Sequence, residues 1–238
     1  MTHSSPTTQP TPTATLMRVL QLTDSAFPAG AFSFSCGLET AAAVGLVRDA
    51  ADLEAFAHDV ARQAALTDGV LALHALHGYR SGSVDSLCAC DEEVLLRKLS
   101  DEARRMTCRM GRKTAEVGRR LISDTLLETW FARITEEQTA GTQPVAQAIL
   151  FGACGAAERE LFCAHLFGVV NMVVSAALRC LRISHFDTQR ILFRAADLAE
   201  ELYDTAREMT PDECYAFFPQ TDILAALHER GAERLFMN

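Results

Sequence analysis

Apolar side chains recur along this chain three and four residues apart, the spacing that places them on one face of an α-helix. The longest such stripe covers residues 95–121, where successive members step by four, four, three, four, four, three and four residues. Its members are Leu95, Leu99, Ala103, Met106, Met110, Thr114, Val117 and Leu121. The stripe predicts one continuous helix, in which Gly111 and Gly118 are places where a second backbone can approach or where the helix breaks.

Shorter stripes of the same kind predict further helices in the rest of the chain. We expect them over residues 16–24, 36–44, 50–66, 68–79, 187–202 and 221–231, from Pro144 onward, and near Leu161. Two stretches lack the pattern, and we expect a polar connection over residues 81–90 and an irregular linker over residues 205–220. Runs typical of strands are nearly absent. The sequence therefore predicts an all-α fold, a single bundle-like domain of about ten helices over residues 15–238.

Two segments bear on where the protein resides. Residues 1–14 are rich in Thr, Pro and Ser without a basic start or an apolar stretch, which predicts a disordered tail and not a targeting sequence. Residues 161–178 approach the length of a membrane span, but His165, Asn171 and Ser175 interrupt them and favour a helix buried in the bundle. Because the sequence shows no secretory signal, we expect its eight cysteines to be reduced thiols. We therefore expect a cytoplasmic protein that does not contact a membrane.

Charge is distributed unevenly over the chain. The net charge is −9, so nucleic acid is not an expected partner. Residues 97–120 nevertheless carry nine basic and three acidic side chains, a local charge of +6 against −15 for the remainder. This arginine-rich strip has two interpretations. It is either a helix face neutralised by its own protein, or a contact with an acidic partner or with a second copy.

Motifs that carry catalysis are missing from the sequence. No nucleophile elbow, phosphate-binding loop or dinucleotide-binding turn appears, and the pair His228-Glu229 lacks the second histidine of a zinc protease. We therefore expect a protein that is not an enzyme and that holds no cofactor.

One set of residues has metal-ligand chemistry. Cys88 and Cys90 follow a helix on which His74 and His77 lie one turn apart, and the four would form a zinc- or nickel-type site if the connection folded back. The alternative is a histidine pair on a helix surface and two loop thiols, because no second cysteine pair completes the site. A nickel- or zinc-binding helical metalloprotein is therefore the alternative function.

Apolar side chains gather at two places where a chain is normally polar. The loop over residues 27–35 contains Phe27, Phe32 and Phe34, and the C-terminus contains Leu235 and Phe236. Chain ends usually fray and are polar. An apolar end either docks on its own domain or binds a partner.

These two segments also carry a resemblance to a known family. The N-terminal motif, D-S-x-x-P-x-G-x-F-x-x-S-x-G-L-E, consists of Asp24, Ser25, Pro28, Gly30, Phe32, Ser35, Gly37, Leu38 and Glu39. Two central motifs consist of Glu102, Arg105, Met110, Gly111 and Arg112, and of Asp187, Gln189 and Arg190. The C-terminal motif consists of Pro219, Asp222, His228, Glu229, Arg234, Leu235 and Phe236. Together, in this order, they resemble the urease accessory protein F family.

The resemblance implies an all-α homodimer that assists nickel insertion into apo-urease and is not itself an enzyme. Such a protein binds a UreD/UreH-like accessory protein, recruits a nickel-carrying UreG-like GTPase through that complex, and can modulate GTP hydrolysis. By position, the tail formed by Arg234, Leu235 and Phe236 docks into the UreD/UreH-like protein. The full set of expected partner-binding residues is Phe32, Ser35, Gly37, Glu39, His228, Glu229, Arg234, Leu235 and Phe236.

Overall fold

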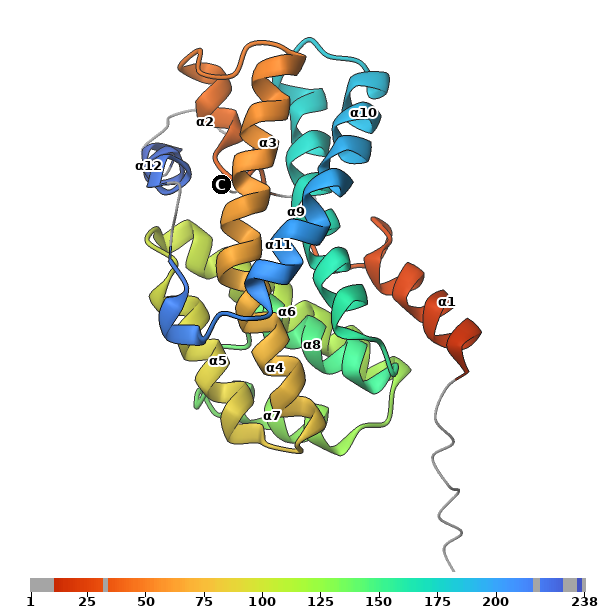
Figure 1. Ribbon diagram of the computed structural model, residues 1–238. Helices are drawn as coiled ribbons and strands as arrows, with labels where there is room; N and C mark the ends of the chain where they lie inside the picture. Colours follow the sequence, from red (N-terminus) through yellow and green to blue (C-terminus); the bar gives the residue numbers. More distant parts are fainter. Residues whose placement is uncertain (1–10, 32–33, 216–218, 229–234, 237–238) are drawn as a thin grey trace, which may run out of the picture.

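Figure 1 shows the computed structural model, which describes residues 11–31, 34–215, 219–228 and 235–236. This part of the chain forms twelve α-helices and no strand. They are α1 (Pro12–Thr23), α2 (Leu38–Ala43), α3 (Ala50–Ala64), α4 (Val70–Arg80), α5 (Val84–Leu96), α6 (Asp101–Leu121), α7 (Thr125–Thr135), α8 (Gln143–Ala153), α9 (Glu158–Cys180), α10 (His185–Ala195), α11 (Ala199–Ala206) and α12 (Pro219–His228). The predicted all-α fold is confirmed.

Helix α9 is the core helix of the bundle and packs against α1, α2, α3, α4, α8, α10 and α11. It is long and apolar enough to cross a membrane, but 61% of its most apolar window is buried inside the protein. The side chain of His165, in the middle of this apolar stretch, is also buried. The expectation of a helix buried in the bundle is therefore confirmed.

Two large hydrophobic clusters fill the interior, beside a small third one formed by Phe34, Met110 and Met172. The first is built from α2, α3, α9, α10 and α11, and in it the ring of Phe162 meets the ring of Tyr203 edge to face. The second is built from α4, α5, α7 and α8 around Trp130, which is fully buried. Helices α4 and α9 contribute side chains to both clusters and so connect them. In Figure 1 the second group of helices occupies the lower half of the molecule.

The arginine-rich stretch is not one continuous helix. Helix α5 ends at Leu96 and α6 begins at Asp101, because Ser100 caps α6 by accepting a hydrogen bond from the backbone N–H of Ala103. Leu99, which the stripe placed inside the helix, is 62% exposed. The prediction of a single helix over residues 95–121 is therefore wrong at residues 97–100.

Helix α5 also occupies most of the segment where a polar connection was expected. Ser83 caps it through the N–H of Ser86, and the buried side chains of Leu87, Cys88 and Cys90 form its inner face. Two of these three side chains are thiols, which pack as small apolar groups. That expectation is wrong because thiols form part of the inner face of α5.

Helix α6 continues through both of its glycines without a break. A Cβ atom at Gly111 would lie 2.3 Å from the carbonyl oxygen of Gly141. At Gly118 a Cβ atom would lie 2.3 Å from Cδ2 of Leu150 on α8. Of the two roles considered for these glycines, close approach is the one the structure shows, and at Gly111 the neighbour is backbone.

The boundaries differ from expectation at both ends of the chain. Helix α1 begins at Pro12, four residues early, because Thr11 accepts a hydrogen bond from the N–H of Ala14. Residues 1–10 of the predicted disordered tail lie outside the described part of the chain. Between α11 and α12 the described residues are irregular apart from a 3₁₀ turn over Pro211–Glu213, and α12 begins at Pro219.

Candidate partner-binding site

The site is built around Glu39 in the first turn of α2. Before this helix, Cys36 and Gly37 adopt positive φ values of 54° and 79°, and the left-handed conformation is the one that glycine tolerates best. Ser35 is fully buried, and its carbonyl oxygen accepts the N–H of Leu38. The side-chain oxygen of Ser35 lies 3.5 Å from the N–H of Glu39. This turn fixes the direction in which the Glu39 side chain leaves the helix.

Glu39 holds the C-terminal end of the chain. Its Oε1 atom accepts the backbone N–H of Leu235 at 2.7 Å, and its Oε2 atom accepts that of Phe236 at 3.2 Å. The Oε2 atom also lies 2.8 Å from Nε2 of His228 at the end of α12. Helix α12 packs beside α2, on the left in Figure 1. Residues nearly two hundred positions apart in the sequence therefore meet at one carboxylate.

A second carboxylate completes the surroundings of His228. Oε2 of Glu102, in the first turn of α6, lies 3.0 Å from Nδ1 of the imidazole. The His228 and Glu102 side chains are only 3% and 5% exposed. Each ring nitrogen of His228 therefore faces one carboxylate oxygen, Nε2 that of Glu39 and Nδ1 that of Glu102. This triad of side chains anchors α12 to α2 and α6.

The two described tail residues face opposite ways. Phe236 is 5% exposed, and the guanidinium of Arg179 on α9 lies 3.9 Å from the centroid of its ring. Such a cation–π contact adds to the burial of the ring in the first hydrophobic cluster. Leu235 is 69% exposed. Of the two interpretations of the apolar tail, docking on its own domain holds for Phe236, whereas Leu235 projects into solvent.

The structure brings most of the expected partner-binding residues together. Those it describes at the site are Ser35, Gly37, Glu39, His228, Leu235 and Phe236. Phe32, Glu229 and Arg234 lie outside the described residues. Sequence reasoning did not place Glu102 or Arg179 at this site. Glu102 belongs to one of the recognised motifs, but no pattern connects that motif, or Arg179, to the C-terminus.

The alternative metal site is not formed. Nε2 of His74 lies 2.9 Å from the carbonyl oxygen of Met209, and Nε2 of His77 lies 3.1 Å from a carboxylate oxygen of Glu158. Cys88 and Cys90 lie on the inner face of α5, where burial raises the pKa of the Cys90 thiol to about 12. Within the described residues, no three His, Cys, Asp or Glu side chains are placed to hold a metal ion. The hypothesis of a Cys88, Cys90, His74 and His77 site is therefore wrong in this fold.

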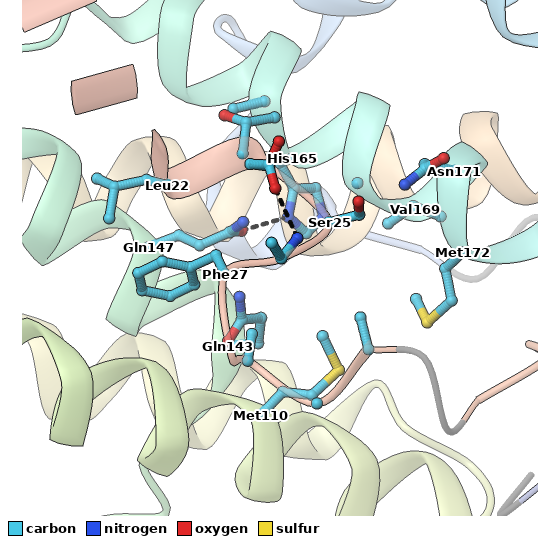
Figure 2. Close-up of a pocket in the computed structure, with 18 of the residues that line it drawn as sticks. Leu22, Ser25, Phe27, Met110, Gln143, Gln147, His165, Val169, Asn171 and Met172 are labelled. Atoms are coloured by element: carbon cyan, nitrogen blue, oxygen red, sulfur yellow. Dashed lines mark hydrogen bonds between the residues drawn. The ribbon is translucent and has the colours of Figure 1, made fainter. Parts of the chain in front are cut away.

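A cavity of about 320 Å³ lies beneath the loop after α1 (Figure 2). His165 and Asn171 from α9, polar interruptions of its apolar sequence, line this cavity. Nδ1 of His165 is 2.9 Å from Oε1 of Gln147, and Nε2 has no hydrogen-bond partner among the described residues. Burial lowers the pKa of His165, so the ring is neutral. Phe27, expected in an exposed aromatic loop, packs instead against the second hydrophobic cluster.

Comparison with known proteins gives one consistent result. The UreF family model matches residues 47–196 of the chain. A urease accessory protein UreF from Photorhabdus laumondii is 39% identical over 223 residues, which cover 94% of this chain and 98% of the relative. Proteins of the same name from Yersinia enterocolitica and Yersinia pseudotuberculosis are 39% and 38% identical over the same shares.

Proposed function

Since the chain belongs to the UreF family of urease accessory proteins, we propose that it bridges a nickel-carrying UreG-like GTPase to a UreD/UreH-like accessory protein. Nickel insertion into apo-urease then proceeds through the complex of these proteins in the cytoplasm. The chain itself is not an enzyme, and its contribution is to position its partners. Modulation of GTP hydrolysis would follow from holding the GTPase in one orientation.

The observation that carries the proposal is the arrangement of the two tail residues at Glu39. The backbone N–H groups of Leu235 and Phe236 donate hydrogen bonds to Glu39, and together with the Phe236–Arg179 contact these bonds fix the backbone of Leu235 against the domain. The Leu235 side chain is thereby presented to solvent on a supported backbone. Covering a fully exposed leucine side chain contributes about 1.5–3 kcal/mol to binding. We assign this surface to the UreD/UreH-like protein.

A separate apolar surface supports the homodimer. Leu16, Met17 and Leu20 on α1 are 53%, 66% and 57% exposed, and Phe167 on α9 and Phe193 on α10 are 44% and 80% exposed. Shallow grooves connect Leu20 to Phe167 and Phe167 to Phe193. Single exposed apolar residues are common, but a connected set of this kind marks a protein interface. We assign this face to a second copy of the chain.

Pull-down with the UreD/UreH-like protein of the same organism tests the tail. We expect Leu235→Asp to reduce recovery of that protein at least tenfold, because a charge replaces an apolar contact. Leu121→Asp is the matched control, because it is the same substitution at a leucine that is 51% exposed at the far end of α6. Recovery that Leu235→Asp leaves intact, or that both variants reduce alike, would contradict the assignment.

Two further measurements separate the parts of the proposal. Recovery of the UreG-like GTPase, with and without GTP, should require the UreD/UreH-like protein and should fall with it in Leu235→Asp. Light scattering should give twice the chain mass for the wild type and for Leu235→Asp. Phe167→Asp should give the single chain mass, because the charge would lie in the apolar face.

A further inference from the structure

The basic side chains of residues 97–120 fall into two groups in the structure. Four are paired with carboxylates of this chain, in the ion pairs Arg97–Glu93, Lys98–Asp68, Lys113–Glu116 and Arg119–Glu128. In contrast, Arg104 and Arg112 each donate Nε–H to a backbone carbonyl. Arg105 forms no hydrogen bond or ion pair with any described residue. Arg104, Arg105 and Arg112, on one stretch of α6, therefore have no carboxylate partner among the described residues.

This part of α6 borders a groove of about 570 Å³. Its lining consists of Arg104, Arg105, Arg109 and Arg112, the apolar side chains Phe34, Leu95 and Met106, and Cys108 and Glu102. Glu102 is the only carboxylate in this lining, and it is already bound to His228. The groove thus combines apolar side chains with four arginines of α6, on a protein whose net charge is −9.

We propose that this groove binds an acidic segment of another protein. Guanidinium groups recognise carboxylates through paired hydrogen bonds, and Arg105 and Arg112, two turns apart along one side of α6, suit a chain laid along the helix. An apolar side chain of that segment would cover Leu95 and Met106, which are partly exposed in the groove, whereas Phe34 is buried at its base. The inference goes beyond the bridging function, because it does not depend on which accessory protein supplies the segment.

The chemistry of the groove favours a peptide over a phosphate ligand. Phosphate sites commonly use the backbone N–H groups at a helix N-terminus. The first turn of α6 instead carries Asp101 and Glu102, and Ser100 caps it. The negative charge of the rest of the chain also opposes nucleic acid. Arginines beside apolar side chains are typical of protein interfaces.

A labelled peptide tests the proposal with the full-length chain. The probe is a fluorescent dodecapeptide that repeats Glu-Asp-Leu-Glu-Asp-Phe twice, and fluorescence anisotropy measures its dissociation constant. We expect Arg105→Glu to weaken binding roughly tenfold, since the change removes one attraction and adds a repulsion. Arg120→Glu is the matched control, because Arg120 is exposed on the same helix, is equally unpaired among described residues and lies outside the groove.

Each outcome either supports the proposal or overturns it. Binding that weakens with added salt, disappears when Gln replaces every acidic residue of the peptide, and falls only in Arg105→Glu supports the proposal. Equal effects of the two substitutions, or absence of binding by the wild type, would overturn it. Inorganic tripolyphosphate binding more tightly than the peptide, with the same loss in Arg105→Glu, would assign the groove to a phosphate ligand and overturn it also. Circular dichroism checks that both variants fold, and none of these results bears on the pull-down with Leu235→Asp.

Discussion

Asp91 in α5 and Glu39 in α2 each accept several hydrogen bonds from distant segments, but they hold different kinds of segment. Asp91 is fully buried and accepts five hydrogen bonds. Its donors are Nε1–H of Trp130, the hydroxyl of Thr139, the N–H of Gly141, and the N–H and hydroxyl of Thr142. Glu39 is 15% exposed at its side chain and holds His228 and two backbone N–H groups of the tail.

Opening the two contacts would have different consequences for the fold. The segment that Asp91 holds joins α7 to α8, so it cannot leave without exposing buried donors and separating two helices. The tail residues that Glu39 holds are close to the end of the given sequence, and their release exposes the ring of Phe236. The Asp91 network therefore serves stability. The Glu39 contact is suited to exchange between the domain and a partner.

The largest effect is expected at Asp91. Asp91→Ala should lower the free energy of unfolding by about 3–5 kcal/mol, because several buried donors lose their acceptor at once. Denaturant unfolding measures this change. Asp85→Ala is the control: Asp85 is on the same helix, pairs with Arg133 and is 82% exposed at its side chain, so its loss should cost less than about 1 kcal/mol. Similar losses in both variants would show that Asp91 does not hold the junction.

Glu39 should show a smaller global effect and a larger local one. Glu39→Ala should lower the free energy of unfolding by about 1–3 kcal/mol, since Glu102 still pairs with His228. Hydrogen exchange at the amides of Leu235 and Phe236 should rise to the rate of an open chain end. Glu54→Ala, which removes an ion pair with Arg194, should leave that exchange unchanged. Protection that survives Glu39→Ala would mean that the ring of Phe236 alone holds the tail.

The sequence predicts the two regions to different extents. The stripe on α6 identified most of that helix, and the terminal motifs placed Glu39, His228 and Phe236 in one expected partner-binding set. Their meeting at one carboxylate was not predictable, since contacts across nearly two hundred residues leave no periodic signal. Asp91 was missed for a related reason. A single buried carboxylate produces no periodic pattern in the sequence. Its helix, α5, was not predicted over residues 84–90 because cysteines occupy part of its inner face.

The cavity beneath the loop after α1 should make stability depend on pH through His165. Burial lowers the pKa of His165, so the folded protein keeps the ring neutral at a pH where the unfolded chain binds a proton. This contribution is present above the ordinary histidine pKa, about 6.5, and is lost as the pH falls below it. Asp68 and Lys98, which are paired with each other, act on the pKa of His165 in opposite directions, so burial sets its direction. We expect the free energy of unfolding to fall less between about pH 7.5 and about pH 5.5 in His165→Gln than in the wild type. An equal fall in both proteins would exclude His165 as the source of the pH dependence.

The smallest expected effect has the opposite sign and compares the packing at the cavity with the packing at the Asp91 junction. Gly168 lies on α9 at the cavity, where an added Cβ atom would meet nothing within 4 Å. Gly168→Ala should therefore raise the free energy of unfolding by about 0.5–1 kcal/mol, because alanine loses less backbone entropy in a helix. The same substitution at Gly111 should be strongly destabilising, since its Cβ atom would lie 2.3 Å from the backbone oxygen of Gly141, whose N–H is bound to Asp91. Thermal unfolding of the two variants compares the regions directly. Destabilisation by Gly168→Ala would mean that the cavity is filled in solution, whereas tolerance of Gly111→Ala would mean that the Asp91 junction can yield.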